Sequence, residues 1–203
     1  MPIFCANIND IVVSFTHVPK CGGTSVKTMM LDAEGLDWRN EVSVDWGIPE
    51  NQRTYKGEKL ADIKIEGGKK LKAINCPTNL NSGAIDEFLI IFLVAAKAKG
   101  ISYFKDLAEL NQKESPRLKW GAKILNMMGV KNIVTNSSIK IYGNPNLEIR
   151  KKIIIKNYLK DHRVFMTSVI ASLSFGGEWH IYDKDSIKTS FPNFLKIIDE
   201  LKN

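Results

Sequence analysis

The chain has 203 residues, enough for one good-sized domain or two small ones. Hydrophobic residues make up 44% and charged residues 25%, as in ordinary globular proteins. The formal net charge of +7 suits anionic ligands such as phosphorylated metabolites. No basic stretch is interleaved with aromatic residues as in a nucleic-acid-binding module, so we expect no nucleic acid partner.

The cysteines and the apolar segments indicate the compartment. Cys5, Cys21 and Cys76 are scattered and odd in number, form no metal-ligand or redox pair, and fit a reducing cytosol. The apolar stretch 85–98 contains three charged residues and is too short to span a membrane. The N-terminus lacks the basic and apolar regions of a signal peptide. We therefore expect a cytoplasmic protein without a membrane partner.

The first element of the chain is a predicted strand over 11–15, a glycine loop over 16–25 and a helix over 26–31. The loop has the features of a phosphate cradle: glycines that let the backbone approach an anion, a lysine, and hydroxyl residues that cap the helix. The alternative is an ordinary turn into a capped helix. The candidate phosphate-binding residues are Lys20, Gly22, Gly23, Thr24 and Ser25. The words Val-Pro-Lys-Cys-Gly-Gly-Thr-Ser resemble the 5′-phosphosulfate loop of PAPS-dependent sulfotransferases, but no motif for the 3′-phosphate follows downstream.

Residues 32–49 are polar and show no periodicity, which indicates a junction. After the junction, predicted strands and helices alternate. The expected strands are 61–65, 70–74, 101–105, 130–135, 138–142, 152–155 and 179–182, and the expected helices are 84–99, 116–128, 162–175 and 188–201. Ser82 or Asn81 is the expected N-cap of the first helix, and Ser115 followed by Pro116 opens the second.

The predicted helix starts carry charged side chains. Asp161 is a good N-cap, and His162 and Arg163 follow it in the first turn, where cations oppose the helix dipole. This placement suggests an anion between them, although a solvated basic start explains it as well. Charged residues mark four such starts, which suggests that these helices converge on a polyanionic ligand. They are Asp86, Lys113 with Glu114 and Arg117, His162 with Arg163, and Lys188.

Several sequence motifs around these helix starts resemble motifs in the C-terminal half of EPSP synthase (3-phosphoshikimate 1-carboxyvinyltransferase). They occur in the same order over about 150 residues. Asn51-Gln52-Arg53-Thr54 with Ala61-Asp62-Ile63 resembles the segment that leads into it. The main words are Ile85-Asp86-Glu87-Phe88, Glu109-Leu110 with Lys113-Glu114-Ser115-x-Arg117, Asp161-His162-Arg163-Val164-x-Met166, and Lys188-Thr189-Ser190-Phe191-Pro192-Asn193-Phe194.

The resemblance implies an α/β (α+β) fold. Residues 51–203 would form an incomplete enolpyruvyl-transferase domain of repeated βαβαββ units, about two of the six units of the family. Residues 41–50 would be a junction, and residues 1–40 a separate strand–loop–helix element. Two residues depart from the family pattern: Asn111 stands where arginine is usual, and Pro116 where aspartate is usual.

The resemblance also implies a chemistry. Phosphoenolpyruvate (PEP) would react through its C2 with the 5-hydroxyl of shikimate 3-phosphate, in the shikimate pathway of aromatic amino-acid biosynthesis. Asp86 would be the base, Glu114 the proton donor and acceptor at the PEP methylene, and Lys113 would lie between the substrates. Arg117, Arg163 and Lys188 would bind PEP, with His162 in support. These residue types fit, because arginine binds carboxylate and phosphate bidentately, and no metal or cofactor is required.

Three functional hypotheses remain. The first is an EPSP synthase-like enzyme, truncated and weak or inactive alone, whose partner could be a separate N-terminal domain or a second copy. The second is a sulfotransferase-like module that binds PAPS or phosphate. The third is an inactive fragment that keeps only the fold.

Overall fold

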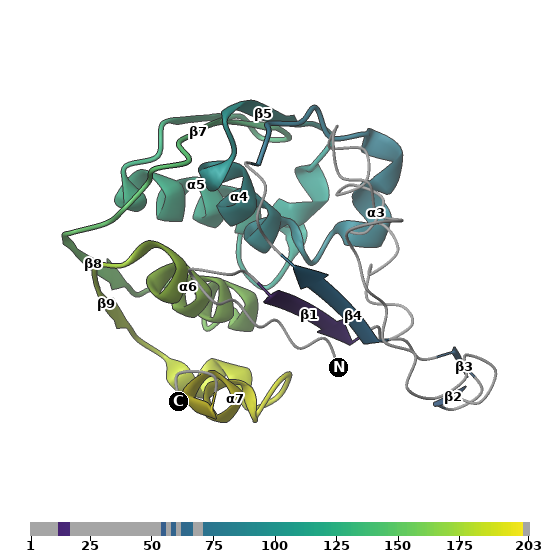
Figure 1. Ribbon diagram of the computed structural model, residues 1–203, viewed down its shortest axis with the longest axis vertical. Coiled ribbons are helices and arrows are strands. Elements are labelled where there is room, and N and C mark those ends of the chain that lie inside the picture. Colours follow the sequence, from purple (N-terminus) through teal and green to yellow (C-terminus); the bar gives the residue numbers. More distant parts are fainter. Residues whose placement is uncertain (1–11, 17–53, 56–57, 60–61, 67–70, 201–203) are drawn as a thin grey trace. The chain divides into compact units, whose positions relative to one another are not determined.

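A computed structural model of the protein describes residues 12–16, 54–55, 58–59, 62–66 and 71–200 (Figure 1). The chain divides into two compact units. Residues 1–69 form the first together with 79–84, and residues 70–78 form the second together with 85–203. The predicted phosphate loop over 16–25 lies outside the described residues, apart from Thr16.

The described part of the first unit is mainly antiparallel. β1 (Val12–Thr16) pairs with β4 (Asp62–Glu66), with Val12 opposite Glu66. β2 (Thr54–Tyr55) pairs with β3 (Glu58–Lys59). The helix α3 (Asn81–Ala84) also belongs to this unit. β1 lies in the predicted element 1–40 and β4 in the predicted domain 51–203, and the two strands pair in one sheet. The predicted boundaries at 40 and 51 stay a prediction.

The second unit begins with an extended segment that lies parallel to β5 (Gly100–Phe104), through bridges from Lys72 to Lys99 and from Asn75 to Tyr103. β5 pairs antiparallel with β7 (Ile139–Gly143), which pairs antiparallel with β6 (Asn132–Val134). Two helices connect these strands, α4 (Phe88–Lys97) before β5 and α5 (Arg117–Met128) after it. This order is β-α-β-α-β-β.

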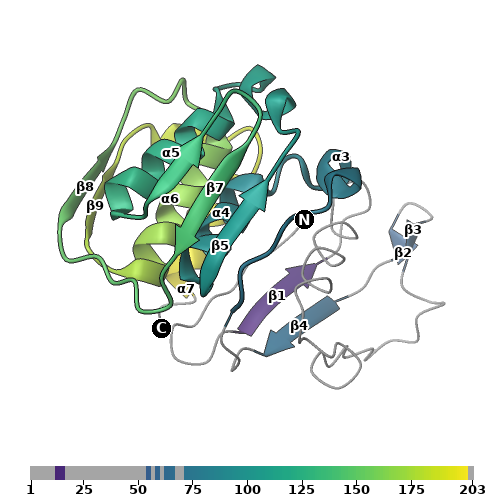
Figure 2. The ribbon, with the colours of Figure 1, turned by 90° about the horizontal axis from the view of Figure 1, so that it is seen from above.

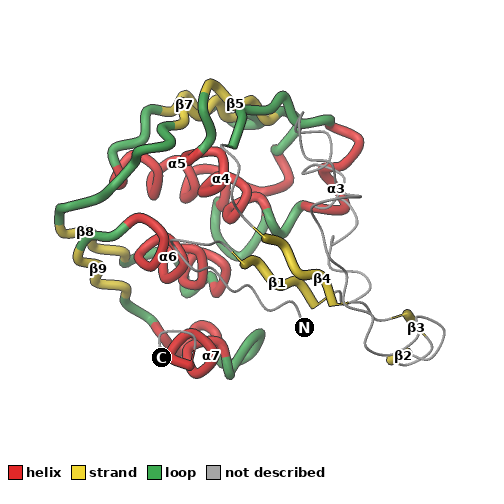
Figure 3. Tube along the Cα trace, in the orientation of Figure 1, coloured by secondary structure: helices red, strands yellow, loops and turns green. Residues whose placement is uncertain are grey.

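The order starts again with β8 (Lys152–Ile155), α6 (His162–Phe175) and β9 (Glu178–Ile181), and β8 pairs in parallel with β9. A short 3-10 turn, η3 (Ala108–Gln112), separates β5 from α5, and η4 (Lys184–Ile187) separates β9 from α7 (Phe194–Glu200) in the same way. Figure 3 shows this alternation of helix and strand. The prediction of an α/β fold with repeated βαβαββ units is therefore confirmed.

The core of the second unit lies between its helices and sheets, and α4, α5 and α6 lie next to one another behind the sheet of β5 and β7 (Figure 2). α4 is apolar almost all round, as a buried helix requires. The rings of Phe88, Phe92 and Phe104 have centroids 5.4–6.0 Å apart. Such aromatic clusters stabilise beyond the area they bury. Gly143 lets β7 approach α4 closely, because a Cβ there would collide with the carbonyl oxygens of Ala95 and Ala98.

Three element predictions need correction. The helix expected over 84–99 is divided, because α3 ends at Ala84 and α4 begins only at Phe88. The strand expected over 70–74 makes isolated bridges rather than a ladder. Lys188 does not open a helix: it closes η4, and α7 begins six residues later. In the described part of the chain, no helix has both the length and the apolar character that crossing a membrane requires.

Candidate active site

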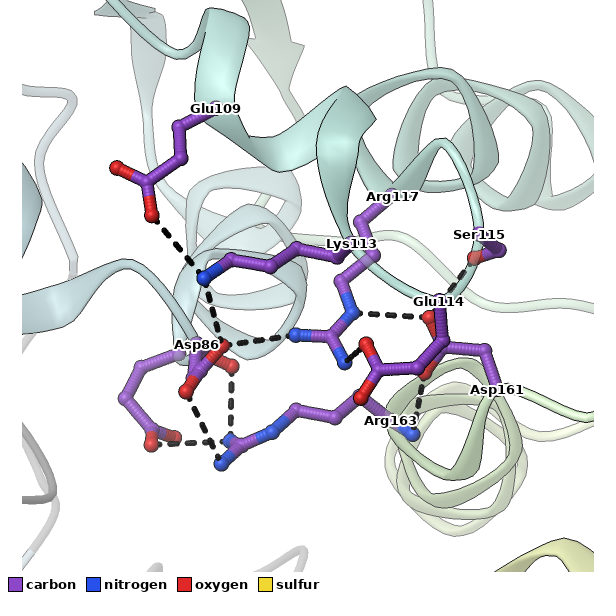
Figure 4. Close-up of polar contacts among 9 residues, drawn as sticks. Asp86, Glu109, Lys113, Glu114, Ser115, Arg117, Asp161 and Arg163 are labelled. Carbon is purple, nitrogen blue, oxygen red and sulfur yellow. Dashed lines mark hydrogen bonds and ion pairs between the residues drawn. The ribbon is translucent and has the colours of Figure 1, made fainter.

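Three helix starts of the second unit meet at one cluster of charged side chains (Figure 4). Asp86 and Glu87 come directly before α4, and Glu87 is its N-cap residue. Lys113 to Arg117 form the turn that leads into α5, and Asp161 to Arg163 open α6. The positive end of a helix dipole lies at each start. The convergence that the sequence analysis predicts is therefore found for three of the four starts.

Arg117 is the centre of this cluster, and its side chain is only 2% exposed. Its Nε donates to Asp161 Oδ2 at 2.9 Å, and its Nη1 donates to Asp86 Oδ1 at 2.8 Å. Its Nη2 donates to Glu114 Oε2. Each nitrogen of the guanidinium thus contacts a different carboxylate. A buried charge is tolerated when it is paired and hydrogen-bonded in this way.

Asp161 is fully buried and joins α5 to α6. Its Oδ1 accepts the backbone N–H of Arg163 at 2.9 Å, which is the predicted N-cap bond. Its Oδ2 accepts both Arg117 Nε and the hydroxyl of Ser115, the latter at 2.8 Å. Burial acts to raise the pKa of the Asp161 carboxyl, but these hydrogen bonds and the charge of Arg117 outweigh it and lower the pKa.

Ser115 therefore does not cap α5 as predicted. Its hydroxyl donates to Asp161, and Pro116 occupies the N-cap position with φ −69° and ψ 79°. The reason is tertiary. The hydroxyl is buried, and a bond to a charged carboxylate stabilises it more than a bond to a neutral backbone group would.

Arg163 occupies the open side of the cluster, with a side chain that is 26% exposed. Its Nη1 donates to the backbone oxygen of Asp86 at 2.8 Å and to Glu87 Oε1 at 3.0 Å. Its Nη2 lies 3.8 Å from Asp86 Oδ2. Burial raises the pKa of the Glu87 carboxyl, and the neighbouring Arg163 opposes this rise. The anion that the position of Arg163 suggests is therefore supplied, in this structure, by two carboxylates of the chain itself.

Lys113 is the third cation of the cluster, after Arg117 and Arg163. Its Nζ lies 3.1 Å from Glu109 Oε1 and 3.9 Å from Asp86 Oδ1, and its side chain is 24% exposed. Asp86 is thus close to three cations, namely Lys113, Arg117 and Arg163. Lys113 Nζ and Arg117 Nη1 lie 3.9 Å and 2.8 Å from the same oxygen, Asp86 Oδ1.

His162 lies at the predicted helix start, whereas Lys188 does not. His162 is the first residue of α6, where burial lowers the pKa of its imidazole. Among the described residues, the ion pair found for Lys188 is with Asp185, at 2.8 Å, and the Lys188 side chain is well exposed. Lys20, Gly22, Gly23, Thr24 and Ser25 lie outside the described residues. No group of three or more potential metal ligands occurs within the described ranges.

Sequence reasoning missed the parts of Ser115 and Glu87 in this cluster, and it identified Asp161 only as a cap. An acidic residue at a helix start is typical of dipole complementation, and nothing in the local sequence indicates that Glu87 is buried beside an arginine 76 positions away. The one sequence feature that points to Glu87 is that it directly follows the candidate base Asp86 in the motif Ile85-Asp86-Glu87-Phe88.

Comparison with known proteins supports the resemblance. The sequence model of the EPSP synthase (3-phosphoshikimate 1-carboxyvinyltransferase) family matches residues 42–198. The 3-phosphoshikimate 1-carboxyvinyltransferase of Ruthia magnifica is 41% identical over 151 residues, which is 74% of this chain and 34% of that protein. The protein of the same name from Thermodesulfovibrio yellowstonii is 29% identical over 196 residues, which is 97% of this chain and 40% of that protein.

Solved structures agree. EPSP synthase from Acinetobacter baumannii superimposes with a TM-score of 0.76 at 31% identity and covers 95% of this chain, which in turn covers 41% of that structure. The enolpyruvyl transferase NikO from Streptomyces tendae has the same fold, with a TM-score of 0.60 at 13% identity. The chain spans about a third of the length of the curated relatives it matches. With 157 matched residues out of 203, the chain belongs to the EPSP synthase family.

Proposed function

We propose that this chain forms one wall of an enolpyruvyl-transferase site for PEP and shikimate 3-phosphate. The observation that carries the proposal is the meeting of Asp86 and Glu114 with Lys113, Arg117 and Arg163 at three helix starts. Transfer of an enolpyruvyl group needs two carboxyl groups for proton transfer and cations for the phosphate and carboxylate of PEP. The cluster contains both kinds of group.

In the proposed reaction, Asp86 takes the proton of the 5-hydroxyl of shikimate 3-phosphate, and the hydroxyl oxygen forms a bond to C2 of PEP. Glu114 gives a proton to the methylene carbon C3, which yields a tetrahedral intermediate. Glu114 then takes a proton back from C3 as the C2–O bond to phosphate breaks, and the double bond forms again. Both carboxylates contact Arg117 in this structure, so Arg117 fixes their separation.

The cations divide into two groups by exposure. Arg163 and Lys113 are about one quarter exposed and can meet a ligand directly. Arg117 is buried, with each nitrogen already on a carboxylate, so it binds PEP only if Glu114 or Asp86 moves. Lys188 binds PEP only if it leaves Asp185, and His162 supports the site from the start of α6.

The second wall of the proposed site lies outside the part of the family that this chain spans, which is about a third of the length of its curated relatives. A separate N-terminal domain or a second copy of the chain can supply it. Closure of two walls excludes water and aligns the reactants, which one wall cannot do. We propose a cytoplasmic reaction, consistent with Cys76 being a free thiol in the structure.

Titration calorimetry of the purified chain with PEP tests this proposal. We expect weak binding, and we expect Arg163→Ala to weaken it by about tenfold, the usual effect of losing a charge-assisted hydrogen bond. Arg150→Ala is the matched control, because Arg150 is exposed and the ion pair found for it among the described residues is with nearby Glu148. Absence of PEP binding to the unmodified chain at millimolar concentration would contradict the proposed site.

The second candidate function rests on the sequence of the N-terminal loop. If Lys20, Gly22 and Gly23 hold a phosphosulfate group, adenosine 3′,5′-bisphosphate should raise the melting temperature of the chain. Lys20→Ala should abolish the rise, whereas Lys196→Ala, on α7, should not. Equal melting temperatures with and without the nucleotide would leave the capped-turn interpretation.

A further inference from the structure

Glu87 is a buried acid next to the candidate base Asp86, and the reaction proposed above does not use it. Its side chain is 9% exposed, and Oε1 lies 3.0 Å from Arg163 Nη1. No side-chain capping bond links it to the start of α4. Burying a carboxylate with a guanidinium as its partner costs desolvation free energy, which is offset only when the geometry is good and further hydrogen bonds are made.

The hydrogen bonds of Arg163 hold one end of its guanidinium. Nη1 is held from two sides, by Glu87 Oε1 and by the backbone oxygen of Asp86 at 2.8 Å. These two bonds fix the plane of the guanidinium. Among the described residues, the contact found for Nη2 is a longer ion pair, 3.8 Å from Asp86 Oδ2, and the side chain is 26% exposed. One end of the guanidinium is therefore anchored to two acceptors of the chain, while the other end keeps donors that can face a further anion.

We infer that Glu87 is a positioning residue, which anchors Nη1 of Arg163 so that the remaining N–H groups of the guanidinium are presented in a fixed orientation to an anionic ligand. This inference rests on the proposed function, because it takes PEP as that ligand. Arginine binds carboxylate and phosphate groups better than lysine does because its planar guanidinium donates two parallel hydrogen bonds. This bidentate binding depends on the orientation of the guanidinium plane. Loss of an orienting partner typically weakens ligand binding by about 10–100-fold at sites where this has been measured, namely metal sites.

The chain offers a direct readout of orientation that does not need PEP. An anchored guanidinium rotates slowly and gives separate Nη–H signals in nitrogen-edited NMR spectra, whereas a free one gives a single averaged signal. Arg163→Lys identifies the signals of Arg163 by their disappearance. We expect resolved Nη–H signals for Arg163 in the full chain, and their collapse in Glu87→Gln, which keeps the shape of the side chain but removes its charge.

PEP titration of the same variants supplies the second readout. Glu87→Gln should weaken PEP binding by about tenfold. The double variant Glu87→Gln/Arg163→Ala should bind no more weakly than Arg163→Ala alone, because Glu87 acts through Arg163. Glu148→Gln is the control, since Glu148 is an exposed glutamate paired with Arg150. If Glu87→Gln does not fold, Glu87→Asp replaces it, with the same expected collapse and weaker binding.

The outcomes separate the two proposals. Collapse of the Arg163 signals with weaker PEP binding supports both. Collapse in a chain that never binds PEP leaves Glu87 as the anchor of Arg163 but overturns PEP as the ligand. Unchanged Arg163 signals in Glu87→Gln would overturn the positioning role whether or not PEP binds. So would a double variant whose loss of PEP affinity equals the sum of the losses, in free energy, of the two single variants.

Discussion

Arg117 and Asp161 are 44 positions apart in the sequence, yet Arg117 Nε donates a 2.9 Å hydrogen bond to Asp161 Oδ2 in the interior of the protein. The bond links the first residue of α5 to the residue that caps α6. Because Arg117 also holds Asp86 and Glu114, this one contact sets where both candidate proton-transfer groups lie.

Asp161→Ala should therefore be strongly destabilising. It leaves the buried charge of Arg117 without one of its partners and removes the cap of α6, and breaking a buried pair typically lowers the free energy of unfolding by about 3–5 kcal/mol. Urea unfolding followed by circular dichroism measures it. Asp185→Ala is the control, because Asp185 is exposed, and its unfolding midpoint should match that of the unmodified chain. Equal small shifts for both variants would contradict the central role of Asp161.

His162 should make stability depend on pH. Burial lowers the pKa of its imidazole below the ordinary value of 6.5, so the unfolded chain takes up a proton more readily than the folded chain. The stability from neutral His162 is present above pH 6.5 and is lost as the pH falls through the pKa of the folded state. Unfolding midpoints between pH 7 and 5 should decline less in His162→Gln. His180→Gln, at a more exposed ring, should keep the decline.

Gly143→Ala and Gly129→Ala should differ in severity. A Cβ at Gly143 would collide with the backbone oxygens of Ala95 and Ala98, which cannot move without shifting the end of α4, and we expect a loss of about 3 kcal/mol or more. Gly129 ends α5 with φ 85° and has nothing near its Cβ position, so only left-handed strain of about 1 kcal/mol opposes alanine. Thermal melting of the two variants checks this order, and a more damaging Gly129→Ala would refute it.

Arg163→Ala should weaken PEP binding more than Lys188→Ala does. Arg163 lies in the cluster, while Lys188 is exposed and pairs with Asp185. We expect about tenfold for Arg163 and about threefold or less for Lys188, as for exposed ion pairs. Calorimetric titrations of both variants decide it. A larger effect of Lys188 would mean that the segment after η4 moves onto the ligand.

Turnover by the chain alone should be negligible, even with Asp86, Lys113, Glu114 and Arg163 intact. Positioning of reactants can supply about 7–11 kcal/mol of barrier reduction, and one wall provides little of it. Phosphate release from PEP and shikimate 3-phosphate is the measurement, with and without a separately expressed N-terminal domain. A rate of about 1 per second or more for the chain alone would show that it completes the site itself, for instance by pairing with a second copy.

The sequence predicts the elements of the second unit well because their signals are local. The start of α6 is predicted at the observed residue, since Asp161 both caps the helix and precedes its apolar run. The hairpin of β6 and β7 is also confirmed, with Thr135 N–H donating to the Ser138 oxygen at 2.8 Å. Three of the four motifs shared with the family, those of Asp86, Lys113 and Asp161, lie at the helix starts that meet in the cluster, whereas Lys188 closes η4.

What the sequence could not predict depends on contacts between distant segments. The division of the helix expected over 84–99 follows from Asp86 and Glu87, whose side chains turn toward Arg117 and Arg163 rather than capping a continuous helix. Ser115 has an ideal capping sequence, but it bonds to a buried carboxylate 46 positions away. Local propensity gives no information about such partners.

The parallel pairing of β8 with β9 has a consequence for how the chain opens. In the described part of the chain these two strands form a sheet of their own, whereas β5, β6 and β7 form a three-stranded sheet. Two strands by themselves are marginal in water and depend on the helix packed against them, here α6. Backbone amides of β9 should exchange with deuterium sooner than those of β7, which has a strand on each side. Within the described part of the second unit, we therefore expect the sheet of β8 and β9 to open before the sheet of β5, β6 and β7.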